Sequence, residues 1–248
     1  MKQERMQSVL LENVLLSLLY RNKTEELERL HPGVLTLLSY SMVGTKEGIR
    51  CLQEVREARV RVRMIVDDQV LEQRSIPALA RETAIDDITR VSEWRQKHAA
   101  YSYLLIPVLP ASLVKKILDF DEEHLFSRLI LEALYQGKKV GAVAAGADPY
   151  QPAWAQRGYD RMSPLLKSEM KSRLQKLRGY GIELLQAGEV AGWLKRTEQK
   201  QRQAPVIARQ EVEEAHRARQ DVIRTSSHAI VTPLARDLAR EYGIEILT

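Results

Sequence analysis

The segment from Tyr103 to Phe126, "YLLIPVLPASLVKKILDFDEEHLF", constrains the fold of this chain more than any other. It begins with an apolar run of strand length that lacks polar alternation, which is typical of a strand buried on both faces. Pro107 and Pro110 interrupt the run, and beyond Ser112 the apolar residues return at the three-to-four residue spacing of a helix. The segment therefore predicts a buried strand, a tight loop and a helix. In open α/β sheets, loops at the carboxyl ends of strands form the crevice in which ligands bind.

The same alternation of apolar runs and helical segments extends over most of the chain. Strands are expected at residues 34–39, 59–68, 103–108, 139–146 and 180–185. Helical patterns occupy residues 42–57, 122–137 and 168–179, while residues 71–100 are polar and helical in parts. Strands that alternate with helices favour a parallel sheet covered on both faces. The fold class predicted is therefore α/β, with a doubly wound, mostly parallel, Rossmann- or flavodoxin-like sheet.

Composition shifts divide the chain into four parts. They are an amphipathic N-terminal helix at 1–30, an α/β domain at 31–187, a charged linker at 188–204 and a small C-terminal module at 205–248. The N-terminal helix either docks on a partner or packs on the domain behind it. In the C-terminal module Thr232, Pro233 and Gly243 fit an N-cap, a first helical residue and a C-cap. That pattern predicts a strand–helix–strand module or a helical tail.

Composition and charge argue against several classes of protein. The net charge of +5 comes from 38 basic and 33 acidic residues that are interspersed, and aromatic residues make up only 6%. Both observations argue against nucleic-acid binding, although a basic surface at 166–178 and 195–220 keeps that alternative open. Cys51 is the only cysteine, which excludes an intramolecular disulfide and fits a reducing, cytoplasmic setting. No apolar run approaches the roughly 20 residues of a membrane span.

The turn "SYSMVGT" after the first strand is the first candidate binding element. It places Ser39, Ser41, Gly44 and Thr45 at a helix N-terminus, where free backbone N–H groups and the helix dipole favour a phosphate. The turn matches neither the dinucleotide fingerprint GxGxxG nor the nucleoside triphosphate loop GxxxxGK[ST]. An ordinary strand-to-helix turn with capping hydroxyls explains it as well.

Residues 33–185 resemble a flavoprotein family that includes the homo-oligomeric flavin-containing cysteine decarboxylases and the dipicolinate synthase flavoprotein subunit. The best-matching part is "LLIPVLPASLVKKILDFDEEHLFSRLILEALYQGKKV". The resemblance implies FMN as cofactor, with its phosphate near the "SYSMVGT" turn and its ring or ribityl chain near Pro110, Ala111 and Ser112. It also implies a homo-oligomer, a trimer or larger, and a redox or flavin-handling role.

Two departures from that family bear on function. Ser112 stands where the decarboxylases carry an asparagine that helps to bind flavin and substrate, which argues against decarboxylation. Asp67 and Asp68 end the second expected strand and would repel a phosphate dianion if they pointed at it. These departures support an alternative, a cofactor-less scaffold or interaction protein on the same fold.

Other polar residues offer no diagnostic catalytic constellation. His98 is expected on a surface helix, and His124 follows acidic residues that complement a helix dipole rather than bind a metal. Asp148 ends the fourth strand, where it either covers the crevice or forms an ordinary turn. His228 and Asp237 lack the context of a catalytic base, so no acid or base is assigned.

The segment "VTPLARDLAREYGIEI" resembles a short module of bacterial microcompartment proteins, especially ethanolamine-utilisation accessory proteins and cobalamin adenosyltransferases. The amphipathic segment 1–30 is similar to the helices that dock cargo to such shells. Together they imply a microcompartment shell or cargo protein as partner and a location inside such a compartment.

Overall fold

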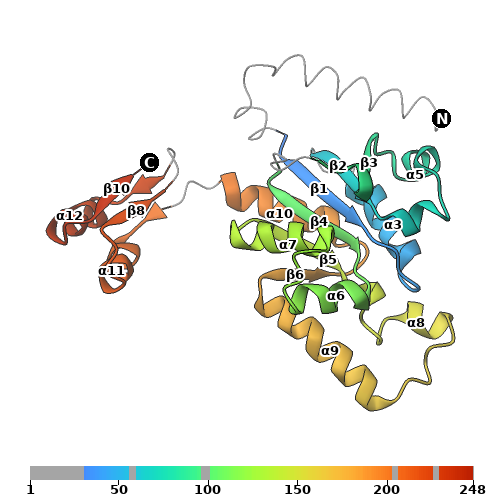
Figure 1. Cartoon of the computed structure of the whole chain (residues 1–248). Helices are drawn as coiled ribbons and strands as arrows, with labels where there is room; N and C mark the ends of the chain where they lie inside the picture. Colours follow the sequence, from blue (N-terminus) through green and yellow to red (C-terminus); the bar gives the residue numbers. More distant parts are fainter. Residues whose placement is uncertain (1–30, 56–59, 96–100, 203–205, 226–228, 248) are drawn as a thin grey trace. The chain divides into compact units, whose positions relative to one another are not determined.

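The computed structural model describes residues 31–55, 60–95, 101–202, 206–225 and 229–247. They belong to two compact units, Met1–Lys195 and Arg196–Thr248, each with its own elements (Figure 1). The helix expected at 1–30 lies outside the described residues.

A six-stranded parallel sheet forms the centre of the first unit. Its strands are β1 (Gly33–Leu38), β2 (Arg61–Val66), β3 (Asp87–Arg90), β4 (Tyr103–Val108), β5 (Lys139–Val143) and β6 (Ile182–Leu185). They lie in the order β3-β2-β1-β4-β5-β6, and each neighbouring pair is parallel. The doubly wound parallel sheet predicted from the sequence is therefore confirmed.

The strand β3 was not expected from the sequence, in which residues 71–100 show only polar and partly helical character. This strand has four residues, none of them buried, and it lies at the edge of the sheet beside β2. The ion pair between Arg63 and Asp87, at 2.7 Å, joins two residues that are partners in the β2–β3 register. Short, half-exposed edge strands give little hydrophobic signal, which explains why the pattern missed it.

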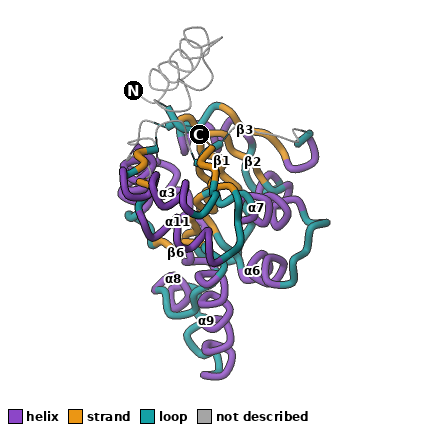
Figure 2. Tube along the Cα trace, turned by 90° about the vertical axis from the view of Figure 1, so that its left-hand side faces the viewer, coloured by secondary structure: helices purple, strands orange, loops and turns teal. Residues whose placement is uncertain are grey.

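Helices cover both faces of this sheet. They are α3 (Thr45–Val55), α4 (Asp68–Leu71), α5 (Ile76–Thr83), α6 (Ala111–Leu118), α7 (Leu125–Tyr135), α8 (Pro152–Gln156), α9 (Pro164–Gly179) and α10 (Val190–Arg202), with 3-10 turns η1 (Val91–Glu93) and η2 (Ala144–Gly146). One face packs on α6, α7 and α9, and the other packs on α3, α5 and α10. Figure 2 shows the same layers from the side.

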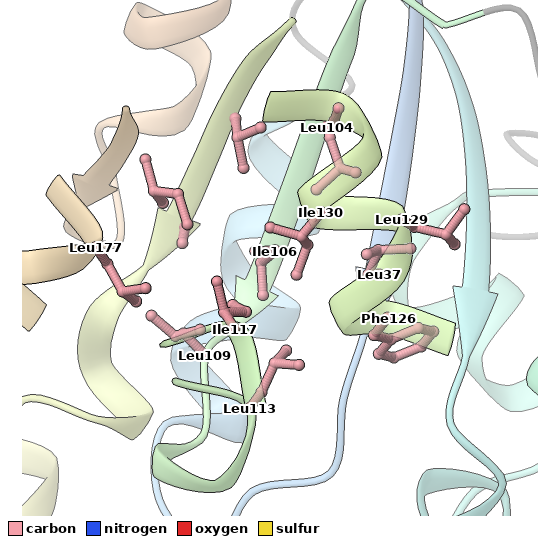
Figure 3. Packing of buried hydrophobic residues seen from close by; sticks show 14 of the residues in the cluster. Leu37, Leu104, Ile106, Leu109, Leu113, Ile117, Phe126, Leu129, Ile130 and Leu177 are labelled. Atoms are coloured by element: carbon pink, nitrogen blue, oxygen red, sulfur yellow. The ribbon is translucent and has the colours of Figure 1, made fainter. Parts of the chain in front are cut away.

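The core on the first face follows from the two periodicities of strand and helix. Leu37, Leu104 and Ile106 project from β1 and β4 toward Ile117 of α6 and Ile130 of α7 (Figure 3). All five side chains are essentially inaccessible to solvent. Apolar residues that recur every two positions on strands and every three to four on helices meet in one layer, as the sequence predicts.

Pro107 explains the broken apolar run. Between β1 and β4 the register shifts, because Thr36 is opposite Leu105 but Leu38 is opposite Val108. β4 therefore advances by three residues where β1 advances by two, which is a β-bulge. Proline has no N–H to donate to the ladder and is tolerated at such a bulge.

Within the segment 188–204, expected to be a charged linker, residues Val190–Arg202 form the helix α10. Val190, Trp193 and Leu194 are buried against the second face of the sheet. The ring of Trp193 lies edge-on to Tyr103 at 6.1 Å between centroids. The division between the two units falls after Lys195, inside this helix.

The second unit consists of two strand–helix–strand halves. They are β7 (Val206–Ile207), α11 (Arg209–Arg217) and β8 (Val222–Arg224), then β9 (Ile230–Val231), α12 (Pro233–Glu241) and β10 (Glu245–Leu247). β7 pairs in parallel with β9, and β8 pairs in parallel with β10. Thr232 caps α12 by accepting a hydrogen bond from Ala235 N at 3.3 Å, and Gly243 ends it with φ +69°, as the sequence predicts.

Candidate functional site

The crevice of greatest interest lies where the strand order reverses. β1 and β4 are neighbours at the centre of the sheet, and the chain proceeds from β1 toward β3 but from β4 toward β6. The connections therefore leave these two strands on opposite sides, and in open α/β sheets ligands bind at the carboxyl ends of such strands. The seven residues predicted as cofactor contacts all lie beyond these two strands, in the loops or the first turns of α3 and α6.

The turn after β1 carries three of the predicted hydroxyl groups. Ser39 is only 4% exposed, and its Oγ has no hydrogen-bond partner among the described residues. Ser41 Oγ accepts a weak hydrogen bond from Val43 N at 3.4 Å, and Thr45 Oγ1 donates to Ser41 O at 3.1 Å. The turn thus contains one buried hydroxyl whose hydrogen-bonding capacity is not used within the described chain.

The loop after β4 leads directly into α6. Pro110 is buried and occupies the N-cap position, but it offers no side-chain acceptor to the first turn. Ala111 and Ser112, which follow it, are exposed. The first N–H groups of α6 therefore lack a side-chain cap, which is the usual condition at an anion-binding helix terminus.

A third loop, which the sequence analysis did not single out, joins the first two. A Cβ built on Gly146 of η2 would lie 2.7 Å from Leu109 O and 2.9 Å from Ser41 Oγ. A Cβ on Gly44 would lie 2.7 Å from Gly146 N, and Gly44 itself has φ +87°. The loops after β1, β4 and β5 thus meet with backbone against backbone, and only glycine fits at these positions.

The acidic residues after β2 are engaged by their own chain. Asp67 caps α4, where its Oδ1 accepts a hydrogen bond from Gln69 N at 3.0 Å. Asp68 Oδ1 accepts a long hydrogen bond of 3.5 Å from Ser92 Oγ. Both carboxylates therefore have hydrogen-bond partners in the chain, although each keeps its negative charge.

His124 serves as a helix cap. Its Nδ1 accepts a hydrogen bond from Ser127 N at 3.4 Å, which requires that Nδ1 carries no proton. Burial lowers the pKa of His124, and the neighbouring Lys116 lowers it further, against opposing effects of Asp121 and Asp67. The neutral imidazole thus stabilises the start of α7.

Cys51 of α3 is fully buried in the hydrophobic core between α3 and the sheet. Burial raises the pKa of its thiol, and the negative charge of Glu54 adds to the effect. A thiol with a raised pKa is a poor nucleophile. The prediction that Cys51 is a core residue is confirmed.

A pocket of about 430 Å³ opens at the carboxyl ends of β5 and β6. Its lining comes from the region after β5, from α9 and from the loop after β6, and none of the seven predicted residues is part of it. Asp148 was considered individually from the sequence, and Lys171, Gln175 and Arg178 belong to the basic stretch 166–178 that was considered for nucleic-acid binding. The other polar lining residues are Tyr150, Gln151, Lys171, Gln175, Arg178, Gln186 and Glu189.

Two kinds of feature are absent from the described residues. Those residues contain no group of three or more His, Cys, Asp or Glu side chains placed to hold a metal ion. Within them no helix combines the length and the apolar character needed to cross a membrane.

Comparison with known proteins gives similarity at the level of structure only. No family model matches the chain, and no curated protein matches its sequence. A dodecameric FMN-dependent Ubix-like decarboxylase from Escherichia coli O157:H7 superposes with a TM-score of 0.44 at 12% identity, over 68% of this chain and 93% of its own. HAL3 from Cryptococcus neoformans gives a TM-score of 0.47 at 13% identity, over 69% and 98%.

A third solved structure, AnUbiX (PadA1) in complex with FMN and dimethylallyl pyrophosphate, gives a TM-score of 0.45 at 9% identity, over 69% of this chain and 90% of its own. At these values the comparisons carry no argument about ligand or activity. The fold assignment rests on the strand order and the two helical layers of the chain itself.

Proposed function

We propose that this protein is an FMN-binding flavoprotein with a redox or flavin-handling role. The observation that carries the proposal is the buried hydroxyl of Ser39, which lies without a partner among the described residues at the switch point of the sheet. A buried hydroxyl that lacks a hydrogen bond is costly unless a ligand or water supplies one.

The residues around the crevice suit the phosphate of such a cofactor. Ser39, Ser41 and Thr45 bring hydroxyl groups, and the start of α6 brings N–H groups without a side-chain cap. The nearby carboxylates of Asp67 and Asp68 already accept hydrogen bonds. We propose that the turn after β1 holds the phosphate and that Pro110, Ala111 and Ser112 contact the ring or ribityl chain, where the bound flavin would supply the redox chemistry.

The absorption spectrum of the purified full-length protein tests this proposal. A flavin spectrum, with FMN identified by chromatography at one equivalent per chain, is the expected result, either as purified or after addition of FMN. Ser39→Ala and Ser41→Ala should weaken FMN binding about tenfold each, since each removes a hydrogen bond to a charged group. Ser168→Ala is the matched control, because Ser168 Oγ donates only to Leu165 O on the surface of α9.

A cofactor-less scaffold is the second candidate, and one observation favours it. The backbone of Gly146 packs against Ser41 and Gly44, so the loop after β5 already occupies part of the space beside the β1 turn. A colourless protein whose spectrum and thermal unfolding do not respond to added FMN would establish this alternative and contradict the flavoprotein.

We further propose that the protein is a homo-oligomer, a trimer or larger. Apolar side chains at the start of α9 support this, since Leu165 is 79% exposed, Leu166 is 48% exposed and Tyr159 lies nearby in sequence at 40%. Exposed apolar groups of this kind are typical of interaction sites. Light scattering of the full chain and of Leu165→Lys should show an oligomer that the substitution weakens; a monomeric parent protein would contradict it.

The association with a bacterial microcompartment is proposed from the sequence resemblance alone. Its support is the segment "VTPLARDLAREYGIEI" in the second unit and the amphipathic pattern at 1–30. Co-sedimentation of the full chain, and of a chain without residues 1–30, with purified shells tests it. Equal sedimentation of the two would contradict a docking role for the N-terminal segment.

A further inference from the structure

We propose that the pocket at the carboxyl ends of β5 and β6 binds the carboxylate or phosphate group of a small molecule whose apolar part lies on the pocket floor. The proposal does not depend on the cofactor, because this pocket contains none of the seven residues assigned to it.

The pocket has one wall of regularly spaced hydrogen-bond donors. Lys171, Gln175 and Arg178 all line it from α9. Spacings of four and three residues place them on one face of the helix, over about 10 Å at 1.5 Å per residue. Tyr150 and Gln186 line it from the loops after β5 and β6.

Both carboxylates of the pocket already accept hydrogen bonds within the chain. Asp148 accepts from Lys171 Nζ at 3.1 Å, from Tyr150 N at 3.2 Å and from Gln151 Nε2 at 3.5 Å. Glu189 Oε2 accepts a hydrogen bond of 2.8 Å from Gln186 N, which closes the turn before α10. Neither carboxylate therefore needs a cationic ligand.

The cations, by contrast, keep unused donors. Lys171 is 43% exposed, and its ammonium group has three hydrogens, of which Asp148 takes one. Arg178 is exposed and makes no ion pair with any described residue. Asp148, whose side chain is only 10% exposed, holds the Lys171 ammonium group in place through their ion pair. The pocket thus presents unused hydrogen-bond donors of Lys171 and Arg178, with the Glu189 carboxylate held at its rim by Gln186 N.

The shape and lining restrict the ligand further. Leu174, Leu184 and Leu185 supply apolar surface to the pocket, and the ring of Tyr150 lies 5.9 Å from Lys171 Nζ. Small-molecule sites combine an apolar surface with a few polar groups in volumes of roughly 300–1,000 Å³. The planar guanidinium of Arg178 matches the two oxygens of a carboxylate or phosphate. A small organic anion with an apolar or aromatic body fits these features.

Calorimetric titration of the full-length protein with benzoate, with its neutral analogue benzamide and with inorganic phosphate tests the proposal. We expect benzoate or phosphate, or both, to bind with at least tenfold higher affinity than benzamide. Preference for benzoate identifies a carboxylate with an apolar body, and preference for phosphate identifies a phosphorylated ligand. Failure of both anions to bind, or equal binding of benzamide, would overturn the proposal.

Two variants distinguish binding at a specific site from non-specific attraction by positive charge. Arg178→Gln should reduce the affinity for the bound anion at least tenfold. Arg173→Gln is the charge-matched control on the same helix, since Arg173 pairs with Glu169 at 2.8 Å and does not line the pocket. Equal losses in the two variants, or no loss in Arg178→Gln, would contradict the site. Ser168→Ala, on the same helix but outside the pocket lining, should leave anion binding unchanged. Arg178 is not among the seven residues assigned to the cofactor, so failure of one proposal does not imply failure of the other.

Discussion

Two candidate sites lie at the same edge of the sheet and are built in opposite ways. At the switch point, three loops meet through backbone atoms and glycines, so that Gly146 lies against Leu109 O and Ser41 Oγ. At the ends of β5 and β6, long polar side chains of α9 face two loops across an open pocket. The packing at the switch point therefore depends on glycines, whereas the pocket at β5 and β6 depends on the long side chains of Lys171 and Arg178. Substitution of a glycine at the first should therefore affect stability most, and substitution of Arg178 at the second should affect ligand affinity most.

The largest effect is expected at the glycine junction. Gly146→Ala places a Cβ 2.7 Å from Leu109 O and 3.0 Å from Val43 O, both backbone atoms that cannot rotate away. Overpacking of this kind should cost about 2–4 kcal/mol of unfolding free energy, measured by urea denaturation. Gly179→Ala at the end of α9 is the control, because its Cβ meets nothing within 4 Å. A neutral Gly146→Ala would show that the three loops move apart readily, which would break the comparison.

A smaller effect is expected at Asp148, which lines the pocket. Asp148→Leu removes the acceptor of Lys171, of Tyr150 N and of Gln151, so three donors lose their partner. The loss should be about 1–2 kcal/mol, because Lys171 is partly exposed and regains water. Asp148→Asn, which keeps an acceptor oxygen, should lose less. Urea denaturation of both variants measures the difference in unfolding free energy. Equal losses would show that the shape of the side chain, and not its hydrogen bonding, determines stability at this position.

Ser39→Ala should change stability by less than about 0.5 kcal/mol or increase it slightly, since the hydroxyl has no partner among the described residues. The same substitution is expected to weaken FMN binding, so stability and affinity should separate at this position. Thermal unfolding without and with FMN measures both. A clear loss of stability in the protein without FMN would mean that the hydroxyl has a partner within the chain.

The smallest effect concerns the pH dependence of stability at His124, the N-cap of α7. Burial lowers the pKa of His124 from its ordinary value of 6.5, so the unfolded chain binds a proton more readily than the folded one. Unfolding free energy should therefore fall as the pH falls from 6.5 through the lowered pKa, by well under about 1 kcal/mol because the ring is partly exposed. His124→Asn keeps a capping group but does not titrate. Urea denaturation between pH 7 and 5 should lose this slope in His124→Asn; an unchanged slope would assign the pH dependence to other groups.

The sequence predicted the fold well wherever local pattern and tertiary environment agree. Apolar runs at 103–108 and 139–146 became β4 and β5, and the parallel doubly wound sheet follows from their alternation with helices. β3 was missed because an exposed edge strand of four residues has no apolar pattern. The helix α10 lies within the segment expected to be a charged linker, since charged residues dominate its second half, whereas Val190 and Trp193 are buried in its first half.

The two candidate sites also differ in how well the sequence could predict them. The β1 turn and the β4 loop are continuous in sequence, so their hydroxyl groups and proline could be identified directly and located by the general rule for α/β sheets. The pocket, however, joins residues between Ala144 and Glu189 that have no motif in common. Only the packing of α9 beside β6 brings Lys171 and Arg178 near Asp148 and Gln186, and spacing in the sequence gave no signal of it.

The interleaved pairing in the second unit has a consequence for how that unit folds. Val206 pairs with Ile230, and Val222 pairs with Glu245, so each half supplies only one strand to each two-stranded sheet. Neither half can complete a sheet by itself, and both pairings close loops of more than 20 residues, which lowers the rate of folding. The two halves must therefore assemble in a single cooperative step, and a half that fails to find its own partner presents the same open strands to the matching half of another molecule.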